Sequence, residues 1–193
     1  MSTVKSKKLQ VGTDATSSNN FTIYQPATPD GSLRIGVGNA DSPTEVGRFD
    51  SNGYVATKNP SFRAIVTGAK TLTFTGSYIK VPFDVVDFDT VGSYNTSSYR
   101  WTPDVEGYYQ FNAYVQLASS VGMHGGFARN GSIIAYGTNA SNVNHYGDQN
   151  SCMFYMNGTT DYVEYFLYVN TTVNTATAGT VVWFDGHLAV PTR

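Results

Sequence analysis

The chain has 193 residues and a formal net charge of −2, and its 13% of charged residues is about half the roughly 25% usual in globular domains. This balance gives no electrostatic reason to expect nucleic acid as a partner, and no apolar run approaches the roughly 18 residues of a membrane-spanning helix. Gly, Thr, Ser, Asn and Tyr are abundant while Leu is scarce, which favours strands and turns over helices. We therefore expect a nearly all-β protein.

The first residues, MSTVKSKKLQVG, carry basic side chains but lack the apolar core of a secretory signal. We therefore expect the chain to mature in a cytosol. The single Cys152 excludes an intrachain disulfide, so stability has to come from packing or from self-association.

Short strands separated by turns are predicted over residues 1–57. The strands are Lys8–Val11, Phe21–Tyr24 and 32–38, followed by a hairpin around Asp50-Ser51-Asn52-Gly53. In the third strand Leu33, Ile35 and Val37 alternate with other residues, so they form one apolar stripe. A unit of this size is marginal alone. We expect it to bury the stripe against copies of itself or against a larger assembly.

Two phrases of this segment, IYQPATPDGSLRIGVGN and EVGRFDSNGYV, resemble the shaft or attachment segments of tailed-bacteriophage virion proteins. The resemblance implies that residues 1–57 bind other virion proteins. It also implies a location at the virion surface after synthesis in the host cytoplasm.

A second β domain is expected over residues 58–193, because Pro60 disfavours a sheet that continues through Asn59. Its clearest strand ends near Leu117 and alternates inward Tyr109 and Phe111 with polar and aromatic neighbours, a period of two that is typical of strands. Aromatic residues exceed the needs of one core, so some are expected at subunit interfaces.

Several phrases of this domain occur in an order that resembles the globular head of complement C1q, a family related to tumour necrosis factor. They are Phe83-Asp84, Trp101-Thr102-Pro103 with Gly107-x-Tyr109-x-Phe111, the hairpin Asn130-Gly131, and Phe184-x-Gly186-x-Leu188. The resemblance covers residues 60–190 and implies a jelly-roll sandwich that assembles as a homotrimer. The residues expected in its core and trimer contacts are Phe62, Trp101, Tyr109, Phe111, Phe184 and Leu188.

Candidate chemistry is sparse. The three histidines have no zinc-ligand spacing, and no carboxylate pair has a recognisable glycosidase context. Asp84, Asp87 and Asp89 could supply oxygens to calcium, but the run lacks the glycine and terminal glutamate of an EF-hand loop. Solvent-facing positions near strand ends explain these aspartates more simply. We expect no enzyme activity and no cofactor.

A long polar loop is predicted over residues 137–151. With Tyr136 just before it, the loop offers side chains suited to hydrogen bonding and stacking on sugars. Two interpretations stay open: contact with a host-surface carbohydrate or protein, or packing against a neighbouring subunit. The contact candidates are Tyr136, Asn142, His145, Tyr146 and Asp148.

The sequence thus predicts an all-β protein with a C1q-like jelly-roll knob, preceded by a small β-rich attachment segment. The leading hypothesis is a non-enzymatic homotrimeric phage virion protein that acts as a short fibre or host-surface adhesin. The alternatives are a capsid decoration protein that stabilises the shell, and a cellular lectin-like protein with the same fold.

Overall fold

The computed structural model describes residues 6–51, 53, 55–57, 59–137, 140–177 and 179–192, with backbone alone for 55–57 and 140–145. Within these ranges the chain forms strands and a single 3-10 turn, η1 (Ser17–Asn19), so the all-β prediction is confirmed. None of its described helical segments is long and apolar enough to cross a membrane. The chain divides into two compact units, Met1–Lys58 and Asn59–Arg193.

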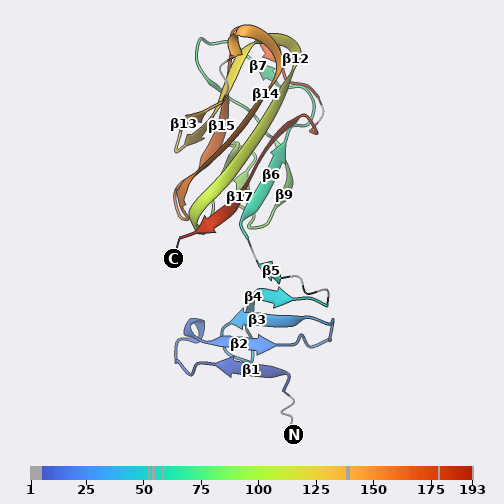
Figure 1. Cartoon of the computed structure of the whole chain (residues 1–193), viewed down its shortest axis with the longest axis vertical. Coiled ribbons are helices and arrows are strands. Elements are labelled where there is room, and N and C mark those ends of the chain that lie inside the picture. Colours follow the sequence, from blue (N-terminus) through green and yellow to red (C-terminus); the bar gives the residue numbers. More distant parts are fainter. Residues whose placement is uncertain are drawn as a thin grey trace. The chain divides into compact units, whose positions relative to one another are not determined.

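The N-terminal unit is an antiparallel meander of five strands in chain order (Figure 1). The strands are β1 (Lys8–Val11), β2 (Phe21–Tyr24), β3 (Leu33–Val37), β4 (Thr44–Phe49) and β5 (Val55–Thr57). The predicted hairpin is present, with Phe49 opposite Val55. A register shift between Ile35 and Gly36 places a bulge in the pairing of β3 with β4.

The C-terminal unit contains twelve named strands in its described residues. They are β6 (Ser61–Ile65), β7 (Thr71–Leu72), β8 (Ile79–Lys80), β9 (Val85–Asp89), β10 (Tyr94–Asn95), β11 (Arg100–Trp101), β12 (Glu106–Arg129), β13 (Ser132–Tyr136), β14 (Ala140–Asn157), β15 (Val163–Val169), β16 (Val173–Asn174) and β17 (Val182–Pro191).

The long strand β12 takes part in both layers of the sandwich, as Figure 1 shows. Its first half pairs with β14 and β17, and β17 continues to β6 and β9; we call this layer sheet I. Its second half pairs with β13 and β15, and β15 continues to β8 and β11; we call this layer sheet II. The predicted strand end near Leu117 is wrong, because β12 continues to Arg129 and shows register shifts against β14 between Gln116 and Met123.

The core lies between the two sheets and is rich in aromatic rings. The ring of Phe62 lies 4.6 Å from that of Trp101 and 4.9 Å from that of Phe184. All six residues expected from the C1q phrases are buried here: Phe62, Trp101, Tyr109, Phe111, Phe184 and Leu188. At the hairpin between β12 and β13, Asn130 and Gly131 have φ of 54° and 79°, as this two-residue turn requires.

Apart from Gly137, the described part of the polar segment 137–151 is not a loop, because Ala140–Asn157 forms strand β14. From Gly147 onward β14 pairs residue by residue with the first half of β12. Main-chain hydrogen bonds in such a ladder do not depend on side-chain type, so a polar sequence can join it.

Candidate functional site

The N-terminal sheet has one apolar face that no described part of its own unit covers fully. The register aligns Leu9 with Ile23 and Ile35, and Val11 with Phe21 and Val37, so these side chains share a face. The predicted stripe of Leu33, Ile35 and Val37 lies there. Its most exposed members are between 37% and 58% exposed: Leu9, Val11, Phe21, Ile23, Leu33 and Phe49.

A groove of about 590 Å³ opens beside this apolar face, lined by Leu9, Ile23 and Leu33 together with Lys7 and Tyr24. Contiguous exposed apolar surface of this kind marks interaction sites in soluble proteins. The face is therefore the candidate attachment surface of the N-terminal unit.

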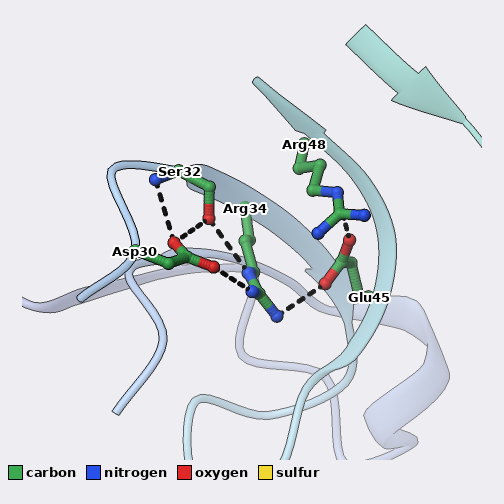
Figure 2. A network of polar contacts seen from close by, with 5 residues as sticks. All are labelled: Asp30, Ser32, Arg34, Glu45 and Arg48. Atoms are coloured by element: carbon green, nitrogen blue, oxygen red, sulfur yellow. Dashed lines mark hydrogen bonds and ion pairs between the residues drawn. The ribbon is translucent and has the colours of Figure 1, made fainter. Parts of the chain in front are cut away.

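The opposite face of the same sheet is held by a network of charges (Figure 2). Arg34 bridges Asp30 at 2.6 Å and Glu45 at 2.9 Å, and Arg48 lies 3.5 Å from Glu45. Hydrogen bonds from the side chain and backbone of Ser32, and then from Arg34, hold the pKa of Asp30 below its usual range. The unit is thus polar and internally paired on one side, and apolar on the other.

The outer face of sheet I is the second candidate surface. By alternation, each inward core residue of β12, β14 and β17 has an outward neighbour, and many of these are large and aromatic or apolar. Tyr108 is 45% exposed and Met153 52%. The members of this face are Tyr108, Tyr114, Met153, Tyr155, Trp183 and Val190.

Polar groups run through the middle of this face. The Nε2 of Gln110 donates to the Ser151 hydroxyl, which donates to Oδ1 of Asn112, whose Nδ2 donates to Asp185. Burial raises the pKa of Asp185, and the hydrogen bond from Asn112 only partly offsets this. Aromatic anchors around satisfied polar groups are typical of protein–protein interfaces.

Arg63 on β6 extends the same face. Its guanidinium carbon lies 4.9 Å from the centroid of the Trp183 ring. Its Nε is buried and has no hydrogen-bond partner among the described residues. The cation–π contact with Trp183 adds a flat charged group to the aromatic residues of this face.

The predicted contact residues of the 137–151 segment do not form one group. Tyr136 and Tyr146 are exposed at 64% and 61%. Asn142 and His145 lie in β14, but their side chains are outside the described residues. Asp148 is buried, so its prediction as a surface contact is wrong.

Asp148 belongs to a buried polar cluster that sequence reasoning missed. The Tyr165 hydroxyl donates to Oδ2 of Asp148 at 2.6 Å, and Nδ2 of Asn150 contacts both groups. Burial, and then the charge of Asp148, raise the pKa of Tyr165. A side chain at Gly125 would collide with the Tyr165 hydroxyl, since a Cβ there would lie 1.9 Å from it.

The three aspartates considered for calcium have separate partners. Asp84 pairs with Lys70 at 2.5 Å, while Asp89 accepts backbone hydrogen bonds from the turn at 91–94. Asp87 lines a shallow pocket beside Arg63. Among the described residues, no group of three acidic, His or Cys side chains could hold a metal ion.

Cys152 is half-buried in β14. Burial raises the pKa of its thiol to about 12, so the thiol is protonated at neutral pH and is a poor nucleophile.

No family profile matches the chain, and no curated protein matches its sequence. Solved structures do match. The globular domain of zebrafish complement 1qA is 12% identical with a TM-score of 0.49, and the match covers 69% of this chain and 99% of that one. Murine APRIL is 8% identical with a TM-score of 0.51, covering 67% of this chain and 98% of that one. Eiger TNF from S. frugiperda is 10% identical with a TM-score of 0.46, covering 70% and 94%.

At such low identity the APRIL match carries information on fold alone. The C-terminal unit shares its fold with murine APRIL, which confirms the all-β jelly roll that the sequence phrases implied.

Proposed function

We propose that this protein is a non-enzymatic, homotrimeric structural protein of a bacteriophage virion. Its N-terminal unit attaches it to the particle, and its knob is exposed and contacts the host surface as a short fibre or adhesin. The observation that carries the proposal is the presence of two unpartnered surfaces, one on each unit: the apolar face of the N-terminal sheet and the aromatic outer face of sheet I.

The trimer is assigned to the outer face of sheet I. The resemblance to C1q heads implies threefold assembly, and this face offers aromatic anchors around a satisfied polar chain. Attachment is assigned to the apolar face of the N-terminal sheet. The resemblance of phrases in residues 1–57 to phage attachment segments implies that the partner is another virion protein.

A capsid decoration role is the second candidate. The groove of about 590 Å³ on the N-terminal unit could receive an apolar side chain of a shell protein. Both roles use the same attachment surface, and they differ in where the protein lies on the particle.

The deciding experiment is immunogold labelling of purified particles with antibodies against residues 59–193. Labelling at the tail supports the adhesin, whereas labelling over the capsid supports decoration. Absence of the protein from particles would reject both and leave a cellular lectin-like protein.

Attachment can be tested in the full chain with Leu33→Asp and Phe49→Asp combined, since these two residues are register partners on the apolar face. We expect incorporation into particles to fall at least tenfold while the purified protein stays trimeric. Ile134→Asp, at a comparably exposed position on β13, is the control that should incorporate normally. Normal incorporation of the double variant would show that attachment uses another surface.

A further inference from the structure

Three aromatic side chains and one histidine gather on the outer face of sheet II. Tyr78 precedes β8, His124 lies on β12, Tyr136 on β13 and Tyr168 on β15, with His124 directly opposite Tyr168. Five pairs of these rings have centroids 5.0 to 6.1 Å apart. A pocket of about 310 Å³, lined by Tyr78, His124, Tyr136 and Gly137, opens among them; we call it the aromatic pocket.

The aromatic pocket is separate from the hydrophobic core. The inward residues of the same strands, such as Met123 and Leu167, fill the core, while Tyr136 is 64% exposed. Self-association through the outer face of sheet I would leave the outer face of sheet II free. The rings around the pocket are therefore accessible in the assembly proposed above.

Polar atoms lie at the edges of these rings. The Tyr78 hydroxyl lies 2.6 Å from Nδ1 and 2.9 Å from Nε2 of His124. Apolar ring faces bordered by a few hydroxyl and imidazole groups are typical of small-ligand sites. A pyranose ring matches this arrangement, because its C–H face packs on aromatic rings and its hydroxyls exchange hydrogen bonds with the edge groups.

The wall of the pocket is fixed from behind by the buried polar cluster. A Cβ at Gly137 would lie 1.3 Å from Oδ1 of Asn150, so only glycine fits between the pocket and this cluster. The Gly137 N–H donates to the Gly125 carbonyl at 2.9 Å, which joins the wall to β12. A wall held in this way reduces the ordering cost of binding.

The charges near the pocket favour a neutral ligand. None of its four described lining residues is acidic. The two nearby carboxylates already have partners. Glu164 pairs with Lys80 at 2.5 Å, and Asp148, in the buried cluster behind the pocket wall, accepts a hydrogen bond from the Tyr165 hydroxyl at 2.6 Å. A quaternary ammonium ion, which aromatic cages also bind, would find no free counter-charge among these groups.

We propose that the aromatic pocket binds a neutral pyranose ring of a surface glycan. This proposal deepens the adhesin role and rests on it for the source of the sugar. It specifies the ligand class and places the host contact on the outer face of sheet II. Of the contact candidates predicted from the sequence, Tyr136 lies at this pocket.

The test uses the full-length protein and saturation-transfer NMR with four probes: the methyl glycosides of β-glucose, β-galactose, α-mannose and N-acetyl-β-glucosamine. We expect transfer to the ring C–H protons of at least one probe. Tyr136→Ala and His124→Ala should each reduce that transfer at least fivefold, while Ile134→Ala, on the same strand as Tyr136 and 43% exposed, should leave it unchanged. Unchanged near-ultraviolet circular dichroism verifies the fold of each variant.

Absence of transfer to all four probes would overturn the proposal, as would transfer that survives Tyr136→Ala. Binding of choline in place of the glycosides would also overturn it and indicate a cation cage.

Adsorption to host cells and incorporation into particles distinguish failure of the sugar site from failure of the proposed virion role. A protein that adsorbs equally well with and without Tyr136→Ala keeps the adhesin role and loses the sugar site, whereas one that binds a glycoside but is absent from particles keeps the site and loses the virion role.

Discussion

Truncation of the outer face of sheet I should dissociate the proposed trimer without unfolding the protomer. The informative variant combines Tyr108→Ala with Met153→Ala, on neighbouring strands of that face. Both side chains are about half exposed in the protomer, so their removal creates little cavity there. The free energy of unfolding of each subunit should fall by roughly 0.5 kcal/mol or less per site. Loss of the ring contact between Tyr108 and Tyr155 should lower it slightly further.

The cost to assembly follows from the exposed area. At about 200 Å² for each fully exposed side chain, the two residues leave roughly 200 Å² of surface per copy to be covered in a trimer. At about 25 cal/mol per Å², complete burial stabilises assembly by at most about 5 kcal/mol per copy. Loss of even a third of this stabilisation would weaken association more than tenfold.

Sedimentation equilibrium over micromolar concentrations measures the effect. Wild type should sediment with about three times the protomer mass of 20.9 kDa, and the double variant should shift toward the protomer. Ile134→Ala with Tyr136→Ala removes a similarly exposed pair from sheet II and is the matched control. A monomeric wild type would refute the trimer, and a trimeric double variant would refute its assignment to this face.

Three further predictions concern the C-terminal unit. Phe111→Ala or Phe184→Ala should each destabilise it by about 3–5 kcal/mol in chemical unfolding, because both rings are fully buried; a change below about 1 kcal/mol would contradict that packing. Gly125→Ala should cost about 1–3 kcal/mol, because its Cβ would press on the buried Tyr165 hydroxyl, and unchanged melting would contradict this contact. The raised pKa of Asp185 means that stability is lost as pH rises through the interval between its unfolded and folded pKa values. Asp185→Asn should therefore raise the melting temperature at pH 7 more than at pH 3, and an equal effect at both would contradict the shift.

Much of the fold follows from local patterns. The strands Lys8–Val11 and Phe21–Tyr24 have the predicted bounds, because each is a short alternating run ended by turn residues. The core also follows from the pattern in the first half of β12, where the inward residues from Tyr109 to Leu117 are buried and aromatic or apolar, and the outward residues are tyrosine, glutamine and asparagine. Period-two alternation specifies which residues share a face, and the family phrases specify the jelly roll.

The segment 137–151 could not be predicted in the same way. Its composition is typical of a loop, yet from residue 140 it forms β14, because β12 supplies backbone partners: a continuous ladder from Gly147 onward, and pairings of Val121 and Met123 with His145 and Ala140 before it. The inward positions Asp148 and Asn150 face Tyr165. Polar inward residues are tolerated only when such a partner exists, and that partner lies on β15, in a separate part of the sequence.

The tyrosines show why the sequence predicts the fold better than the function. Tyr109 and Tyr165 are buried in the core, whereas Tyr108 and Tyr155 lie outside sheet I and Tyr136 lies outside sheet II. Alternation separates inward from outward residues, but it does not tell which outward face meets another subunit and which meets a ligand. That distinction depends on neighbours from distant strands: a polar chain through Asn112 on one face, and a pocket closed by His124 on the other. The two faces are therefore best assigned by the paired variants above, each of which alters one and leaves the other intact.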